Sequence, residues 1–230
     1  MVTHSGAPGR NCPLCPRLKQ FRDEWREWEP SWFNAPVPSF GPATASLLIV
    51  GLAPGLRGAN RTGRPFTGDF AGDLLYDTLK HFGFAAGDYR ARPDDGLMLV
   101  NARITNAVRC VPPENKPTPE EIRTCRRFLE STIGDMPNLR AIVTLGHIAH
   151  ASTIAALNQR RALAPFGHGL SHEIGALRVF ASYHCSRYNT STGVLTTDMF
   201  RDVFASVRAY LDARNQASTS SAFLSGGNTG

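Results

Sequence analysis

Four short apolar runs punctuate the chain, at residues 46–50, 97–104, 141–145 and 179–183. Each is rich in β-branched or aliphatic residues and is bounded by turn residues or by a helical pattern. These runs predict strands that are buried on both faces of a sheet.

Amphipathic segments lie between the runs. The clearest spans residues 69–82, where Leu74, Leu75, Leu79 and Phe82 recur at helical spacing. This spacing predicts a helix with one apolar face that packs against the sheet.

A second helix is predicted to begin after Thr118. The Thr118 hydroxyl would cap the first turn, Pro119 suits the first helical position, and Glu121 completes a capping box. Further helices are predicted over residues 147–160 and 197–214. Since strands and helices alternate, we expect a three-layer α/β/α fold with helices on both faces of a central, mostly parallel four-stranded sheet.

Length and composition favour a single domain. A chain of 230 residues, 42% of them apolar, can bury one sizeable core. We place the domain at residues 11–214, after a flexible N-terminus at residues 1–10. Residues 215–230 are rich in Ser, Gly, Thr and Asn, and this composition predicts a disordered C-terminal tail.

The charge balance indicates a partner for the chain. A formal charge of +6 and a pI of about 9.4 suit a protein that binds a polyanion such as nucleic acid.

No apolar stretch approaches the roughly 20 residues that span a bilayer, and residues 1–10 lack the apolar segment of a secretory signal. We therefore expect a cytoplasmic protein with no membrane partner, working as a monomer.

Four of the five cysteines fall into two pairs. Cys12 and Cys15 form a C-x2-C hook, and Cys110 and Cys125 flank a proline-rich loop. In a reducing compartment such cysteines bind metals, react or pack, and four converging thiolates suit either zinc or a [4Fe–4S] cluster. Cys125 taken alone could be a buried packing residue. Cys185 is expected to pack or to line a site without binding a metal.

A glycine-rich, cationic segment at residues 51–69 follows the first run and precedes the first helix. Taken by itself it could cradle a phosphate, because glycines admit backbone N–H groups close to an anion and Arg61 and Arg64 add charge. It is not a Walker A loop, since the Gly-Lys-Ser/Thr ending is absent. At the ends of two other runs, Asn106 and His184 carry polar side chains suited to reading a nucleobase.

Taken whole, residues 51–69 closely resemble the first motif of the family 5, or type B, uracil-DNA glycosylases, with Gly-Leu-Ala-Pro followed by Asn-Arg-Thr-Gly-Arg-Pro-Phe-Thr-Gly-Asp. Residues 104–117 and 183–190 resemble two further motifs of that family, and the likeness covers residues 12–211. It implies a repair enzyme that flips uracil, and other damaged bases such as hypoxanthine, out of DNA and hydrolyses the N-glycosidic bond to leave an abasic site. It also implies a [4Fe–4S] cluster on the four paired cysteines.

The resemblance assigns roles in the pocket. Phe66 matches the aromatic residue that stacks on the extruded base, Asn106 the amide that reads its polar edge, and His184 the histidine that contacts the departing base. Ala53 stands where other glycosylase families carry a water-activating Asp or Asn. The remaining residues expected to line the substrate site are Gly51, Pro54 and Gly55.

Asp69 matches the carboxylate associated with uracil removal in this branch of the family. It also stands where the following helix needs an N-terminal cap. Backbone N–H groups would keep a capping carboxylate ionised, which suits stabilisation of a sugar cation better than activation of water. The expected catalytic residues are therefore Asp69, Asn106 and His184.

Side chains around these motifs are candidates for DNA contacts. Arg187 and Tyr188 could wedge into the gap that a flipped base leaves. The motifs offer no lysine nucleophile, so we expect no lyase step. Two other interpretations stay open: a non-catalytic DNA-binding module with iron–sulfur or zinc, and a hydrolase of free nucleotides. The full set of predicted DNA contacts is Arg57, Arg61, Arg64, Arg187, Tyr188 and Asn189.

Overall fold

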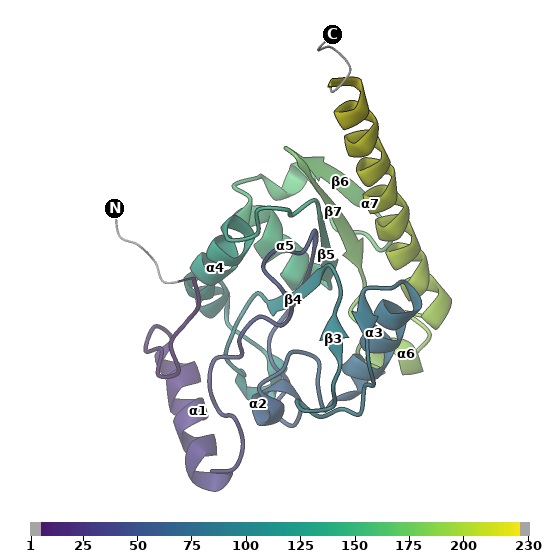
Figure 1. The fold of residues 1–230 in the computed structure, drawn as a ribbon. Helices are drawn as coiled ribbons and strands as arrows, with labels where there is room; N and C mark the ends of the chain where they lie inside the picture. The colour runs from purple at the N-terminus through teal and green to yellow at the C-terminus, as the bar shows by residue number, and fades with distance from the viewer. Residues whose placement is uncertain (1–5, 226–230) are drawn as a thin grey trace.

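A five-stranded sheet in the order β4-β1-β5-β7-β6 forms the middle layer of the computed structural model (Figure 1). Residues 6–225 are described, of which residue 215 and residues 217–225 by backbone alone. The four parallel strands are β1 (Leu47–Gly51), β4 (Ala102–Asn106), β5 (Ala141–Leu145) and β7 (Leu177–Ser182). The prediction of four parallel strands is confirmed, and β6 (Ser171–Ile174) adds an antiparallel edge that the sequence pattern did not predict.

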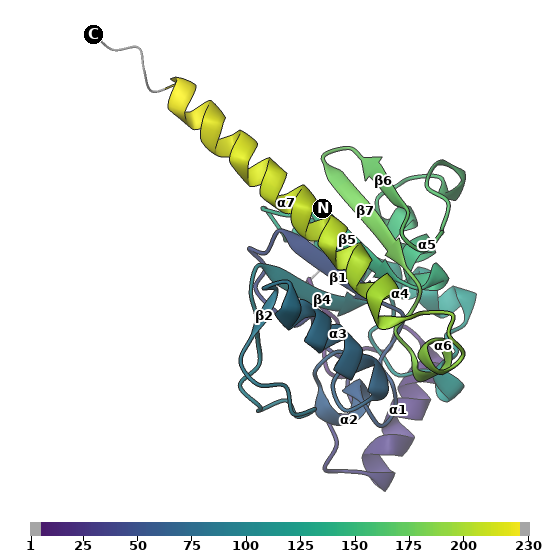
Figure 2. The same cartoon turned by 90° about the vertical axis from the view of Figure 1, so that its right-hand side faces the viewer.

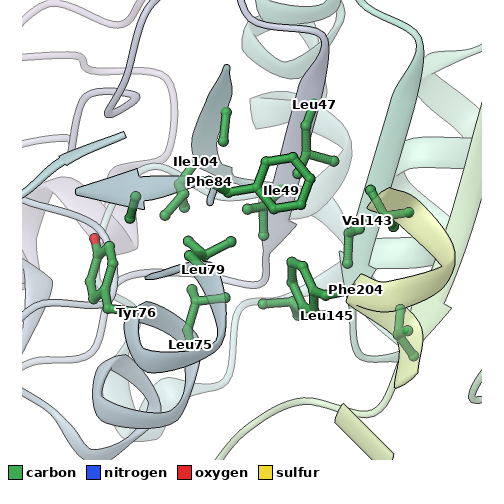
Figure 3. Close-up of a cluster of buried hydrophobic side chains, with 14 of the residues drawn as sticks. Leu47, Ile49, Leu75, Tyr76, Leu79, Phe84, Ile104, Val143, Leu145 and Phe204 are labelled. Carbon is green, nitrogen blue, oxygen red and sulfur yellow. The ribbon is translucent and has the colours of Figure 1, made fainter. Parts of the chain in front are cut away.

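Helices cover both faces of the sheet. On one face α3 (Phe70–His81) and α7 (Thr197–Ser225) bury a core that includes Leu47 and Ile49 of β1 (Figure 3). On the other face α4 (Pro119–Gly134) and α5 (His147–Ala156) pack over Leu48 and Val50. Alternate residues of β1 thus enter opposite cores, which is why this run is continuously apolar.

The predicted strand at residues 97–104 is two strands. Asn101 adopts a left-handed conformation with φ of 50°, and its side-chain oxygen accepts a hydrogen bond from the Ser46 backbone nitrogen at 2.8 Å. The chain therefore turns at Asn101. Before this turn, β3 (Met98–Leu99) pairs with β2 (Ala85–Ala86) in a separate two-stranded sheet, and after it the chain enters β4.

The helix ends differ in places from the prediction. The α5 helix stops at Ala156, before Asn158 with its positive φ of 56°, and does not reach residue 160. The α7 helix continues to Ser225 and projects beyond the body of the domain (Figure 2). Residues 215–225 are thus helical where a disordered tail was predicted, and the rest of that tail, like residues 1–5, lies outside the described residues.

Several short elements were not predicted, and α1 (Pro16–Trp28) is the largest of these unpredicted helices. Its Trp25 stacks on Trp32 with ring centroids 5.3 Å apart. The others are α2 (Ala59–Thr62), α6 (Arg187–Ser191) and two 3-10 turns, η1 (Pro113–Asn115) and η2 (Arg161–Leu163). Within the described part of the chain, no helix is long and apolar enough to cross a bilayer.

The strand order identifies where a ligand should bind. From β1 the chain passes through α3 to β4 on one side, then through α4 to β5 on the other side of β1. Doubly wound sheets bind ligands where the order reverses in this way, beyond the carboxyl ends of the strands. Here Gly51 at the end of β1 pairs with Asn106 at the end of β4. The short helices α2 and α6 lie at this same end of the molecule (Figures 1 and 2).

Candidate active site

A cavity of about 570 Å³ opens beyond the carboxyl ends of the strands. Its volume falls in the usual range of ligand pockets, about 300–1,000 Å³. The loop after β1, the start of α3, the end of β4 and the segment after β7 supply its walls. Among the lining residues are Ala53, Pro54, Gly55, Arg57, Phe66, Asp69, Asn106, His184 and Arg187. The residues expected to contact a base therefore share one cavity, and only Gly51 of that set is not in its lining.

Gly51 does not line the cavity, but its lack of a side chain leaves space for the Phe66 ring. A Cβ atom on Gly51 would lie 2.7 Å from Cζ and 2.8 Å from Cε2 of Phe66, too close for any larger residue. The Phe66 ring is only 7% exposed and stacks toward the imidazole of His184, with centroids 5.9 Å apart and planes 28° apart. An aromatic face and an imidazole therefore stand on the same cavity.

Asn106 is the last residue of β4 and is 3% exposed. Its Oδ1 is buried and finds no hydrogen-bond partner within the described residues. Buried polar atoms in native proteins are nearly always paired, so an unpaired acceptor on a cavity wall points to a ligand donor. The amide is thus free to read a bound molecule.

His184 follows β7 and is half-buried. The structure, over the residues that it describes, gives neither ring nitrogen a protein partner, whereas the His184 backbone oxygen accepts a hydrogen bond from Nδ2 of Asn189 at 2.8 Å. Burial lowers the pKa of His184 to about 4. The imidazole is therefore neutral at pH 7 and offers one N–H donor to the cavity. Asn189, expected to contact DNA, instead uses its side-chain amide to hold the His184 loop.

Asp69 caps α3, as predicted: its Oδ1 accepts a hydrogen bond from the Gly72 nitrogen at 3.3 Å. Glycines leave space for the other oxygen, since a Cβ atom on Gly58 would lie 2.4 Å from Oδ2. Burial raises the pKa of Asp69 and outweighs the backbone hydrogen bonds from Gly72 and Ala71. The backbone N–H groups lower this pKa, as expected of a cap, but burial has the larger effect, and the net rise moves Asp69 toward the range of a general base.

The predicted DNA-contacting arginines divide into two groups. Arg57 and Arg187 are exposed and line the cavity, and Arg61 is exposed but is not among the lining residues. Arg64 is only 5% exposed, and both of its terminal nitrogens bind Asp95 at 2.8 Å. The prediction of a phosphate contact by Arg64 is therefore wrong, because its charge is already neutralised inside the protein.

Two further side chains are exposed close in sequence to residues that line the cavity. Tyr188 is 74% exposed, as a wedge residue would have to be. Phe70 was not singled out in the sequence, yet it is exposed, lines the cavity and lies under the guanidinium of Arg187, 5.2 Å from the ring centroid. Its position directly after Asp69, as the first residue of α3, was the available signal.

Asn115 and Ser186 are other lining residues that sequence reasoning assigned no role. Asn115 has a positive φ of 57° and comes from the loop between β4 and α4. Asparagine tolerates this conformation better than most residues, so the Asn in the proline-rich loop was a usable hint.

All four paired cysteines line one small cavity between the start of α1, the segment after β4, and α4. Arg22 donates from Nη1 to Sγ of Cys110 at 3.5 Å, and the Arg109 backbone nitrogen donates to Sγ of Cys125 at 3.3 Å. In residues 6–225, no three Cys, His, Asp or Glu side chains are grouped so that they could hold a single metal ion.

Cys185 lies apart from this cluster of thiols. It is fully buried in the main core, and its Sγ contacts the carbonyl oxygen of Ala71 at 3.4 Å. This position agrees with the expectation of a packing residue.

Comparison with known proteins gives a consistent result. The model of the uracil DNA glycosylase superfamily matches residues 38–208. A type-5 uracil-DNA glycosylase of Thermus thermophilus is 46% identical over 84% of this chain and 90% of its own length. Proteins of the same name from Pyrobaculum aerophilum and Mycobacterium bovis are 37% and 42% identical, over 89% and 75% of their lengths and 88% and 84% of this one. The chain therefore belongs to the uracil-DNA glycosylase superfamily and, within it, to the type-5 branch.

Proposed function

We propose that the protein removes uracil from DNA by hydrolysing the bond between the base and C1′ of the sugar. The observation that carries this proposal is that Phe66, Asn106 and His184 line one cavity at the carboxyl ends of the strands. A base inside a duplex must be flipped out before its glycosidic bond can be reached, at a cost of a few kcal/mol. Stacking on Phe66 would return about 1–3 kcal/mol of that cost.

Asn106 suits the recognition of uracil. Its unpaired Oδ1 can accept the imide N–H of the base, while Nδ2 can donate to the neighbouring carbonyl oxygen. Cytosine presents an unprotonated ring nitrogen at the imide position, so Oδ1 would face another acceptor. A site built to pair such a group rejects analogues that leave it unpaired.

The chemistry of the bond follows from the charges that develop. When the bond breaks, its electron pair leaves with the base, and the sugar gains cationic character. The neutral imidazole of His184 can donate its N–H to a base oxygen as negative charge grows there. The carboxylate of Asp69 can stabilise the sugar cation and take the proton of the water that adds to C1′. The products are the free base and an abasic sugar.

The same cavity supports a wider range of bases. Ala53 contributes only a methyl group to the wall, and about 570 Å³ leaves room for a purine. Hypoxanthine carries an N–H next to a carbonyl group, as uracil does, so Asn106 can pair with it. We therefore include hypoxanthine among the proposed substrates.

The enzyme is proposed to be monofunctional. Among the described residues, no lysine lines the cavity. Lys116, which directly follows the lining residue Asn115, forms an ion pair with Glu114 at 3.2 Å. A lyase step needs an amine at C1′ to form a Schiff base. We also propose that the protein acts as a monomer, because a single chain supplies the cavity walls. Its cytoplasmic location stays a prediction.

The four paired cysteines are proposed to hold a [4Fe–4S] cluster. Arg22 and Arg109 are buried beside them, and the Nε of each has no hydrogen-bond partner among the described residues. Arg109 has no acidic side chain within ion-pair distance in the described chain, and Asp23 lies 3.9 Å from Nε of Arg22. Buried cations need counter-charges, which four thiolates around a metal centre would supply and four neutral thiols would not.

The family resemblance of the motifs is what favours a cluster over zinc, since four thiols that line one cavity could serve either centre. A bound cluster would supply a structural cross-link between α1 and α4. Purified protein is expected to be brown with about four irons per chain, whereas a colourless, zinc-loaded protein would overturn the assignment.

The decisive test is excision from a panel of duplexes that each carry one altered base. Uracil and hypoxanthine duplexes should yield an abasic site that breaks only after heat or alkali. Binding without an abasic product would indicate a non-catalytic module, and preference for monomers would indicate a nucleotide hydrolase. Spontaneous nicking by the pure protein would contradict the monofunctional proposal.

A further inference from the structure

The buried guanidinium of Arg64 lies in an aromatic and acidic enclosure, the Arg64 box, which consists of Phe40, Tyr76, Tyr89 and Asp95 around Arg64. Arg64 binds Asp95 through two hydrogen bonds of 2.8 Å. Its Cζ atom lies 5.3 Å from the Phe40 ring centroid, 5.6 Å from that of Tyr76 and 5.8 Å from that of Tyr89. The bidentate ion pair and the surrounding rings together hold the Arg64 guanidinium in one orientation.

The box holds the backbone on which the Phe66 ring depends. Tyr76 donates to the carbonyl oxygen of Pro65 at 2.6 Å, and Tyr89 donates to that of Phe66 at 3.2 Å. Arg64 itself donates from Nε to the Thr67 hydroxyl at 2.7 Å. The residues directly before and after Phe66 are thus tied to the same enclosure.

Phe66 needs this support because its backbone is in the left-handed region, with φ of 52°. A bulky residue adopts that conformation only when its surroundings impose it. The neighbouring helix is shaped to match, since a Cβ atom on Gly72 would lie 2.0 Å from the Phe66 oxygen and 2.4 Å from the Tyr89 hydroxyl. Relaxation of this turn would swing the ring away from the cavity.

We propose that Tyr89 and the Arg64–Asp95 pair are positioning residues that aim the Phe66 ring at the flipped base. None of these three side chains lines the cavity, so we expect them to act through Phe66. The inference rests on the proposed function, because it assumes that Phe66 stacks on a base. It predicts that their contribution to excision disappears when the Phe66 ring is absent.

The test is a double-mutant cycle on the full-length protein, using single-turnover excision from a uracil duplex. Tyr89→Phe removes one hydroxyl and should lower the rate about threefold to tenfold, as expected for one lost hydrogen bond. Asp95→Asn should lower it further. In a Phe66→Ala background, which is already slow, both changes should have no additional effect.

Controls separate aiming from general stability. Tyr210→Phe removes a hydroxyl from α7, away from the cavity, and should leave the rate unchanged. Thermal melting of every variant shows whether it is folded, and if Asp95→Asn does not fold, Tyr89→Phe alone carries the cycle. An equal loss from Tyr89→Phe in both backgrounds would overturn the positioning inference. A wild-type excision rate from Phe66→Ala would also overturn the positioning inference, but it would leave the proposed excision activity in place. If the wild-type protein releases no uracil, it is the proposed function that fails.

Discussion

A single imidazole shows how residue-scale physics bears on the proposed reaction. Neither ring nitrogen of His184 has a hydrogen-bond partner in the described structure, and the ring faces a cavity and is neutral because burial lowers its pKa to about 4. Asn106 likewise presents an unpaired oxygen to the same space. The protein leaves the hydrogen-bonding capacity of both groups unused, so both can form new hydrogen bonds when a ligand binds.

Replacement of either group tests these roles. His184→Ala and Asn106→Ala should each lower excision about a hundred- to thousandfold, the usual effect of removing one preorganised hydrogen-bonding group. Circular dichroism and melting should show an intact fold. His81→Ala, an exposed histidine at the end of α3, is the matched control. Wild-type rates from both site variants would remove the assignment.

The pH profile distinguishes a neutral imidazole from a charged one. With a pKa near 4, His184 stays neutral from pH 5 to 8, so it should cause no fall in rate as the pH rises. A protonated donor of ordinary pKa would instead lose activity above pH ~6.5. At the acid end, protonation of Asp69 should slow excision, and its raised pKa places that loss at a higher pH than an unperturbed aspartate would. Asp69→Asn should abolish this acid limb.

At the scale of elements, strand ends and short helices together make the surface that DNA would meet. The α6 helix carries Arg187 and Tyr188, and the loop before α2 carries Arg57. All three side chains are exposed, and Arg57 and Arg187 line the cavity, unlike Arg64 within its box. Phosphate contacts should therefore come from Arg57 and Arg187.

Salt dependence measures such contacts. Arg57→Gln and Arg187→Gln should each reduce the slope of log K against log salt by about 0.9 on duplex DNA, the value for one neutralised phosphate. Arg92→Gln, an exposed arginine that pairs with Asp94 outside the cavity lining, should leave the slope unchanged. Unaltered slopes for both cavity variants would place the DNA elsewhere on the surface.

Across the whole molecule, the cysteine cavity and the candidate active site share a wall. Ala53, which lines the active-site cavity, packs against the small core of Leu18, Val108, Cys110 and Cys125. Arg17 of α1 adds a tie by binding Glu121, the residue that completes the cap of α4. If these cysteines hold the proposed cluster, its loss should loosen α1 and the loop that carries Ala53.

Substitution of the cysteines tests that dependence. Cys125→Ser should lose iron and visible absorbance and should melt at a lower temperature, because the cross-link between α1 and α4 is gone. Cys185→Ser should retain a full complement of iron per folded chain, since Cys185 packs in another core. Equal iron loss in both variants would contradict the ligand assignment.

Much of this protein follows from its sequence by local rules. Strand and helix periodicity, the capping box at Thr118 and the cap at Asp69 depend on residues a few positions apart, and the structure has them as predicted. The family motifs indicated Phe66, Asn106 and His184, and the ends of the predicted strands indicated Asn106 and His184 independently. The break at Asn101 was missed because its partner Ser46 is 55 residues away.

Only the tertiary structure decided which of these groups are available for chemistry. Arg64 looked free in the sequence, yet Asp95, 31 positions along the chain, neutralises it and leaves it to brace the turn at Phe66. The neutrality of His184 and the unpaired oxygen of Asn106 likewise depend on what surrounds them in space. Burial and charge pairing are properties of neighbours brought together by folding, and no local pattern of residues specifies them.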